Sequence, residues 1–307
     1  MENREHPRGA VTRGPSLTDR LRAWPQYLLP GHALSRIIHR LTRLRAGWFK
    51  NLAIGTVVRL YDVDLSEAAV TDPRAYPTFN AFFTRPLERG ARPLAGGEGT
   101  VVSPVDGVVS QAEAIASDGR IFQAKGQSYT ATELLGGSQE RSAPFSGGSF
   151  ATLYLSPRDY HRIHMPLAGR LREMVHVPGR LFSVDAATTR AVPRLFARNE
   201  RVAAIFDTAA GPMAVVSVGA LFVSGIETVW HGLVTPPRGR RVATWEYPDT
   251  GEGSVALAKG EELGRFNMGS TVIVLFPPGA VEWAEGLAPE AAVRMGQAIG
   301  QRTGGGS

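Results

Sequence analysis

The sequence predicts an α+β protein in which amphipathic N-terminal helices precede a mostly antiparallel, sandwich-like β core. Beyond residue 100, short apolar runs alternate with Gly, Pro, Asp and Ser, which is typical of antiparallel strands joined by turns. Before residue 60, apolar residues recur at the spacing of one helix face. The chain has 307 residues, of which 43% are hydrophobic, and this is enough for one large core or two small ones.

The first part of the chain divides into a polar end and a helical region. Residues 1–15 are polar and contain several Gly and Pro, so we expect them to be disordered. Residues 17–29 are interrupted by a proline, which leaves room for one or two short helical turns. One amphipathic helix is expected over residues 33–52, and a further short helix over residues 80–83. Residues 16–95 are therefore predicted to form a basic helical region.

The β-rich region is predicted to span residues 96–290, and residues 291–307 are expected to form a flexible tail. Within the β-rich region, few helices are expected, chiefly near residues 129–135 and 183–190. The expected strands are the apolar runs Val101–Val102, Val108–Val109, Phe150–Leu155, Leu171–Val177, Val202–Phe206, Ala214–Val223, Val242–Tyr247 and Thr271–Phe276.

Positive charge is concentrated at the N-terminus. Residues 1–60 carry eleven Arg or Lys and three acidic residues, whereas the whole chain has a net charge of +6, so the remainder is slightly acidic. Two interpretations fit the predicted helix over residues 33–52. A helix docked on the core explains its apolar stripe, and a helix lying on an anionic membrane also explains its arginines and the Trp48-Phe49 pair. No nucleic-acid motif accompanies the charge, so we expect no nucleic-acid partner.

Composition excludes several kinds of chemistry. The chain has no cysteine, which rules out disulfides, thiolate nucleophiles and cysteine-ligated metals. No apolar run reaches the roughly 18 residues that indicate a membrane-spanning helix. The N-terminus also lacks the apolar segment of a signal peptide, so a cytoplasmic protein is expected.

Three places in the β-rich region carry residues suited to catalysis. Asp106 lies in a turn between two valine pairs, His161 and His164 are three residues apart, and Ser270 follows Gly269 at the start of a predicted buried strand. Each has a plain structural interpretation, since Asp often stabilises turns and Gly often marks a bulge. A metal site on the two histidines lacks a recognisable third ligand, so no metal is predicted. An Asp, His and Ser assembly of hydrolase type is the other possibility, although Ser270 does not lie in a Gly-x-Ser-x-Gly motif.

Six ordered motifs together resemble the phosphatidylserine decarboxylases, specifically the longer bacterial membrane-associated kind. The similarity begins near Gln26 and covers nearly all of the remaining chain. One departure is Met268, where the family commonly has Leu, and this change nearly conserves volume. The motifs are Ser103-Pro-Val-Asp-Gly107, Lys125-Gly126-x-x-Tyr129, Tyr160-His-Arg-Ile-His-Met-Pro166, Asn199-Glu200-Arg201, Val218-Gly219-Ala220 and Met268-Gly-Ser-Thr271.

The resemblance implies a proenzyme that cuts itself between Gly269 and Ser270. In this family the serine hydroxyl attacks the preceding carbonyl to give an ester, and elimination followed by hydrolysis converts the serine into a pyruvoyl group, so no external cofactor is needed. His164 matches the base for Ser270, and Asp106 matches the acid that orients this base. His161 matches the residue that assists decarboxylation of phosphatidylserine to phosphatidylethanolamine.

The resemblance also implies partners and a location. The proenzyme would yield an α and a β chain, with a homodimer of cleaved protomers, and phosphatidylserine in an anionic membrane would be the substrate. The protein would bind peripherally at the cytoplasmic face of the bacterial inner membrane. A serine hydrolase of triad type and a non-enzymatic basic membrane-binding protein remain the alternatives, and both predict a single uncut chain.

Overall fold

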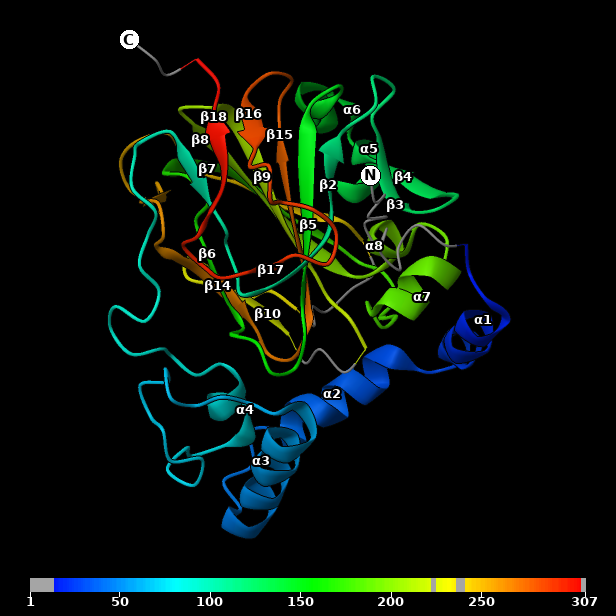
Figure 1. Cartoon of the computed structure of the whole chain (residues 1–307), viewed down its shortest axis with the longest axis vertical. Coiled ribbons are helices and arrows are strands. Elements are labelled where there is room, and N and C mark those ends of the chain that lie inside the picture. The colour runs from blue at the N-terminus through cyan, green and yellow to red at the C-terminus, as the bar shows by residue number, and fades with distance from the viewer. Residues whose placement is uncertain (1–13, 222–224, 236–240, 305–307) are drawn as a thin grey trace, which may run out of the picture.

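The computed structural model describes residues 14–221, 225–235 and 241–304. The predicted disorder of residues 1–15 therefore falls almost wholly outside the described residues, as does Val223 at the end of one predicted strand. Within the described part, the chain forms antiparallel β sheets preceded by helices, which confirms the predicted fold class (Figure 1).

A nine-stranded antiparallel sheet is the centre of the described structure. Its central strands read as continuous apolar runs because both faces of the sheet are covered. In β15, for example, Val272 and Val274 pack on one face, and Ile273 and Leu275 pack on the other. The strands in spatial order are β12 (Ala243–Glu246), β7 (Gly169–Val177), β8 (Arg201–Thr208), β9 (Gly211–Val218), β15 (Ser270–Phe276), β5 (Ser149–Leu155), β2 (Gly107–Ala114) and β17 (Ala292–Val293), with β13 (Ala256–Leu257) paired to β7.

Two smaller sheets cover one face of the nine-stranded sheet and give the core its sandwich character. Their buried side chains, such as Val101, Ile163 and Phe266, share one hydrophobic cluster with Val272 and Leu153 of the large sheet. The three-stranded sheet consists of β1 (Thr100–Val102), β18 (Ala298–Arg302) and β16 (Val281–Trp283), and the four-stranded sheet consists of β11 (Gly232–Leu233), β10 (Ile226–Thr228), β14 (Glu262–Phe266) and β6 (Arg162–His164).

Short helices and a hairpin cover the other face. Phe145, Leu134 and Phe196 from these elements pack against Ile273 and Leu275 of β15 in a second cluster. Two of the helices fall where the sequence predicted them, near residues 129–135 and 183–190. The elements are β3 (Arg120–Ala124), β4 (Gln127–Thr130), α5 (Ala131–Leu134), α6 (Gln139–Ser142), the 3-10 helix η3 (Ala143–Phe145), α7 (Ala186–Ala191) and α8 (Leu195–Arg198).

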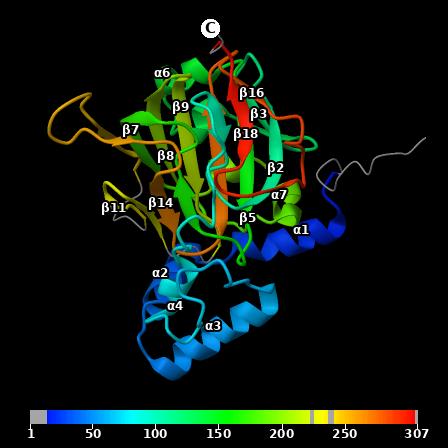
Figure 2. The same cartoon turned by 60° about the vertical axis from the view of Figure 1, so that its left-hand side comes forward.

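The N-terminal region (residues 14–95) contains α1 (Leu17–Ala23), the 3-10 helix η2 (Trp24–Tyr27), α2 (Gly31–Leu41), α3 (Gly47–Tyr61) and α4 (Phe79–Phe83). Ser16 and Asp19 form a capping box that starts α1, and an ion pair of 2.9 Å between Asp19 and Arg190 fixes α1 against α7. In both views, α3 and α4 lie below the β sheets (Figures 1 and 2). We call α3, α4 and the loops after them the lower lobe (residues 47–95).

The prediction of one helix over residues 33–52 is wrong, because the chain leaves the helix between α2 and α3. The carbonyl of Thr42 accepts a hydrogen bond of 2.8 Å from the backbone N–H of Asn80, far along the chain. The next residue, Arg43, is also held by Glu227 of β10, with 3.4 Å between the charged atoms. These tertiary contacts override a helical pattern that would otherwise continue.

The lower lobe has its own small hydrophobic cluster. Ile54 of α3 and Phe79, Phe82 and Phe83 of α4 are buried together, and Met268 from the β region packs against them. Thr78 caps α4 by accepting a hydrogen bond of 3.1 Å from the backbone of Ala81. This packing brings α4 against the chain around residue 268, which immediately precedes the predicted cleavage site.

The prediction of a flexible tail over residues 291–307 is wrong for the part that the structure describes. Strand β17 pairs with β2, and β18 pairs with both β1 and β16, while Ile299 is fully buried in the sandwich cluster. The segment carries few apolar residues, so its strands depend on partners far away in the sequence. Residues 305–307 lie outside the described residues. Among the described helices, none is long and apolar enough to cross a membrane.

Candidate active site

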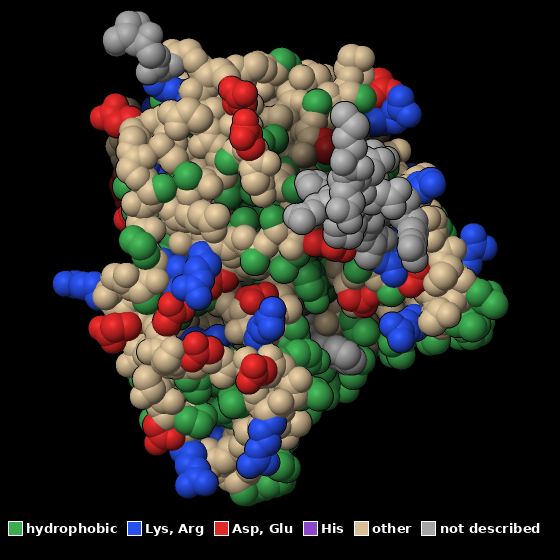
Figure 3. Space-filling view, in the orientation of Figure 1, with side chains coloured by type: hydrophobic (Ala, Val, Ile, Leu, Met, Phe, Trp, Pro, Cys, Tyr) green, Lys and Arg blue, Asp and Glu red, His purple; other side chains and the backbone are tan. Residues whose placement is uncertain are grey.

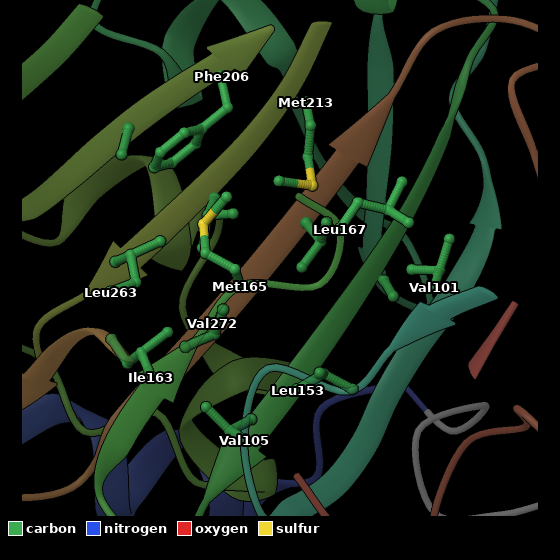
Figure 4. Close-up of a cluster of buried hydrophobic side chains, with 14 of the residues drawn as sticks. Val101, Val105, Leu153, Ile163, Met165, Leu167, Phe206, Met213, Leu263 and Val272 are labelled. Carbon is green, nitrogen blue, oxygen red and sulfur yellow. The ribbon is translucent and has the colours of Figure 1, made fainter. Parts of the chain in front are cut away.

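The sheets bring the predicted site residues to neighbouring strand ends. Asp106 precedes β2, His161 and His164 lie before and at the end of β6, and Ser270 opens β15. Their sequence neighbours Val105 and Ile163 are buried in the sandwich cluster, beside Leu153 and Val272 (Figure 4). Rigid core residues therefore set the position of each functional side chain.

Gly107, which follows Asp106, has no room for a side chain. A Cβ atom there would lie 2.2 Å from the backbone oxygen of Tyr154 on the paired strand β5. Glycine thus allows the Asp106 turn to approach β5 closely. The same strand ends at Leu155, which pairs with Ser270.

The Gly269–Ser270 bond joins a half-buried glycine to a buried serine. Ser270 is fully buried, and its Oγ has no hydrogen-bond partner among the described residues. A Cβ atom on Gly269 would lie 3.5 Å from the backbone oxygen of Leu155 and 3.7 Å from Nε2 of His161, so glycine leaves the histidine ring next to this peptide. Met268, just before it, has a φ of 138°, a strained conformation for a residue with a side chain.

His161 presents a free nitrogen toward this bond. Its Nδ1 lies 2.8 Å from the carbonyl oxygen of Asp159, which only accepts, so Nδ1 carries the proton and Nε2 carries the lone pair. Nε2 is buried and has no partner in the described part of the chain. Burial lowers the pKa of His161 to about 3, and the ring packs 4.1 Å from that of Phe83. His161 is therefore a neutral acceptor beside Gly269.

His164 is also neutral, but both of its ring nitrogens are occupied. Nδ1 donates to the carbonyl oxygen of Gly260 at 2.8 Å. Burial raises the pKa of Tyr160, so its hydroxyl keeps its proton and donates to Nε2 of His164 at 3.0 Å. Burial also lowers the pKa of His164, which favours its base form.

Asp106 is held by partners other than His164. Its carboxylate accepts hydrogen bonds from Arg92, the shortest 2.6 Å, and from the backbone N–H of Met295 at 2.8 Å. These bonds with Asp106 raise the pKa of Arg92 above its usual range. Asp106, the acid that the resemblance pairs with His164, therefore makes no direct hydrogen bond with this histidine among the described residues, and its charge only partly offsets the lowering of the His164 pKa by burial.

The sequence interpretation missed a group of arginines around a cavity of about 300 Å³ between the lower lobe and the β core. Arg85 and Arg92 each begin an Arg-Pro-Leu tripeptide, whose proline indicates only a break in the chain. The repeated tripeptide is the signal that could have found them. The lining residues are Asp62, Asp64, Glu67, Arg85, Leu87, Arg92, Asp106, Gly107, Val108, Arg158, Asp159, Tyr160, Ala292, Val293 and Arg294.

The metal interpretation finds no support in the site geometry. Residues 14–221, 225–235 and 241–304 contain no group of three or more His, Asp or Glu side chains that could hold a metal ion. Nδ1 of His161 and Nδ1 of His164 both donate to backbone carbonyls, so neither nitrogen faces the other ring. The site residues fit proton transfer and attack by a hydroxyl instead.

Comparison with known proteins shows the family of this chain. Residues 79–301 match the family model described as phosphatidylserine decarboxylase, and residues 21–62 match one described as PSD. A phosphatidylserine decarboxylase proenzyme of Ectopseudomonas mendocina is 58% identical over 92% of this chain and 99% of its own length. The proenzyme of Pseudomonas aeruginosa is also 58% identical, over 92% and 98%, and that of Azotobacter vinelandii is 55% identical, over 93% and 99%. This chain therefore belongs to the phosphatidylserine decarboxylase family, a group of lyases made as proenzymes that carry a pyruvoyl group derived from a serine.

Proposed function

We propose that the proenzyme cuts itself between Gly269 and Ser270, and that Ser270 becomes the pyruvoyl group. In the first step, Oγ of Ser270 bonds to the carbonyl carbon of Gly269, the peptide C–N bond breaks, and the proton of the Ser270 hydroxyl is transferred to the freed amine, so that an amide becomes an ester. The observation that carries this proposal is a buried Ser270 Oγ without a partner, next to a residue with no side chain. The strained φ of Met268 supports it, because cleavage releases backbone strain.

We assign activation of Ser270 to His164, with Asp106 as the charge that stabilises the protonated ring. Support comes from the family motif and from the neutral base form of His164. Its acceptor nitrogen Nε2 is bonded to the hydroxyl of Tyr160 before cleavage. The proton of Ser270 can therefore reach His164 only after this hydrogen bond opens.

We assign the decarboxylation step to His161. The pyruvoyl carbonyl supplies the electron sink for the carbanion that forms when carbon dioxide leaves. The lone pair on Nε2 of His161 lies beside residue 269, so this histidine can assist decarboxylation or the reprotonation of the carbon that lost carbon dioxide. The surrounding site is buried, which favours loss of charge from the carboxylate.

Single substitutions separate these roles when cleavage is followed on a denaturing gel and decarboxylation by released carbon dioxide. Asp106→Asn and His164→Ala are expected to leave mostly full-length chain. His161→Ala is expected to cleave at least in part and to decarboxylate poorly. Full activity of His161→Ala would remove its assigned role, and wild-type cleavage by His164→Ala would show that another group activates Ser270.

We further propose that the N-terminal helices bind the surface of an anionic membrane, at the cytoplasmic face of the bacterial inner membrane. Trp24 and Trp48 are 64% and 75% exposed, which is unusual for such large apolar side chains. Hydrophobic side chains gather along the lower edge of the molecule, over α1, α2 and α3 (Figure 3). The exposed apolar residues of these helices and their connections are Leu17, Leu21, Trp24, Leu28, Leu29, Ile37, Leu41, Leu44, Trp48, Leu52, Leu60 and Tyr61.

Charge reversal tests this membrane contact. Arg36, Arg40 and Arg45 are exposed, whereas Arg43 is bonded to Glu227 and is left unchanged. Each arginine near an anionic surface contributes about 1 kcal/mol, so replacing all three by Glu is expected to weaken vesicle binding at least about 100-fold. Self-cleavage should continue, because the β core is untouched. Co-sedimentation with phosphatidylserine-containing vesicles measures the effect, and unchanged, salt-insensitive binding would place the membrane contact elsewhere.

The assembly state is also part of the proposal. Family membership implies an α and a β chain from one proenzyme and phosphatidylserine as the substrate. We propose a homodimer of such cleaved protomers on the basis of the resemblance. Light scattering of the cleaved protein measures its mass, and a value equal to one protomer would contradict the dimer.

A further inference from the structure

One arginine at the cavity beside the active site lacks a counter-ion. Arg85, Arg92, Arg158 and Arg294 all line this cavity. Arg92 pairs with Asp106 and Glu67, Arg294 pairs with Glu67 at 3.0 Å, and Arg158 lies 3.9 Å from Asp159. Among the described residues, Arg85 alone of the four has no carboxylate within ion-pair distance.

Arg85 is nevertheless buried, with 3% of its surface exposed. Its Nη2 donates to the carbonyl oxygen of Arg158 at 3.0 Å, and its guanidinium lies 5.5 Å from the ring centre of Phe82. Nε and Nη1 are buried and find no acceptor in the described part of the chain. Two donors of a buried cation are thus left without partners.

A buried arginine with two unpaired donors is unfavourable unless an anion binds to it. A buried charge without a partner destabilises a folded protein, and buried cations are normally paired. Burial lowers the pKa of Arg85 accordingly. The carboxylates of Asp64, Asp106 and Asp159 act on it only from a distance, through their charges.

Arg85 also lies close to the reacting groups. It follows α4, whose residue Phe83 packs against the ring of His161. The guanidinium of Arg85 lies 5.5 Å from the ring centre of Phe82, and the ring of His161 lies 4.1 Å from that of Phe83, so both side chains pack against α4. An anion held by Arg85 would therefore lie beside the histidine that flanks Gly269.

We propose that Arg85 binds the phosphodiester of the phospholipid headgroup and so positions the headgroup for reaction; this rests on the placement of the reaction at Ser270. The substrate carries two anionic groups, a carboxylate and a phosphodiester. The carboxylate loses its charge as carbon dioxide leaves, so an ion pair with arginine would stabilise the ground state more than the transition state. The phosphodiester keeps its charge throughout, and Arg is well suited to bind it.

Kinetics with a soluble substrate test this assignment without the membrane contact. Arg85→Met and Arg85→Lys are compared with wild type on dihexanoyl phosphatidylserine, kept below the concentration at which it forms micelles. Arg120→Met, which removes an exposed arginine of β3, is the control for net charge. Loss of a charge-assisted hydrogen-bond partner is expected to raise KM about 10- to 100-fold for Arg85→Met, with a smaller change in kcat. A KM equal to that of the control, in an Arg85→Met protein that has cut itself fully, would overturn the proposal.

A second measurement distinguishes the two anionic groups and works on wild type alone if Arg85→Met does not fold. Glycerophosphoethanolamine keeps the phosphodiester and lacks the carboxylate. It is expected to inhibit wild type competitively at concentrations where ethanolamine does not, and to lose this inhibition in Arg85→Met. Equal inhibition by the two compounds, or equal inhibition of wild type and Arg85→Met, would show that Arg85 does not bind the phosphodiester. Failure of wild type to cut itself at residue 270 would instead contradict the proposed function.

Discussion

Acid is expected to destabilise this protein through His161, and the size of the effect follows from its burial. Burial lowers the pKa of this histidine from 6.5 to about 3 in the folded protein. Between these two values the unfolded chain binds a proton that the folded protein does not, so the free energy of unfolding falls as pH falls. At about 1.4 kcal/mol per pKa unit, the loss between pH 7 and pH 4 is about 3 kcal/mol from this residue.

Urea unfolding at pH 7 and pH 4 measures this contribution. The parent is the Ser270→Ala variant, which keeps one uncut chain, and the comparison is the same chain with His161→Gln. Because glutamine does not titrate, the variant should lose about 3 kcal/mol less than the parent over this range. His32→Gln, at an exposed histidine, controls for general effects of removing a histidine. Equal pH dependence in the parent and the His161→Gln chain would refute the assignment of a neutral, buried His161.

Two further substitutions examine the site and its support. Tyr160→Phe removes the hydroxyl that occupies Nε2 of His164, so self-cleavage should be no slower than in wild type. The loss of full-length chain with time measures the rate. Slower cleavage would mean that the hydroxyl takes part in proton transfer. Gly107→Ala places a Cβ atom 2.2 Å from the backbone oxygen of Tyr154, so strand β2 must shift. The yield of soluble, cleaved protein should therefore fall strongly. Normal yield and cleavage would show that this turn tolerates a side chain.

The β core could be predicted from sequence because its strands carry their own signal. The run from Val272 to Phe276 is apolar throughout, which fits a strand buried on both faces, and a strand lies there with Ser270 as its first residue. The break between α2 and α3 could not be predicted, because it depends on Asn80 and Glu227. Strands β17 and β18 were missed for the same reason, since their pairing partners, and not their composition, make them strands.

The sequence named Asp106, His161, His164 and Ser270 as candidate site residues, but it indicated few of their contacts. Family membership decides against the hydrolase and the non-enzymatic protein. The partners of these side chains come from distant segments. Arg92 holds Asp106, and Arg85 has no counter-ion among the described residues. Neither fact is visible in a local pattern.

Intact mass spectrometry of the purified protein tests the central claim most directly. Wild type is expected to give two fragments, one ending at Gly269 and one beginning at residue 270 with a pyruvoyl group in place of serine and therefore no free amino terminus. Ser270→Ala should give a single full-length mass and no decarboxylation, because it removes both the attacking oxygen and the precursor of the pyruvoyl group. A cut at another position, or cleavage of the Ser270→Ala chain at residue 269, would contradict the account.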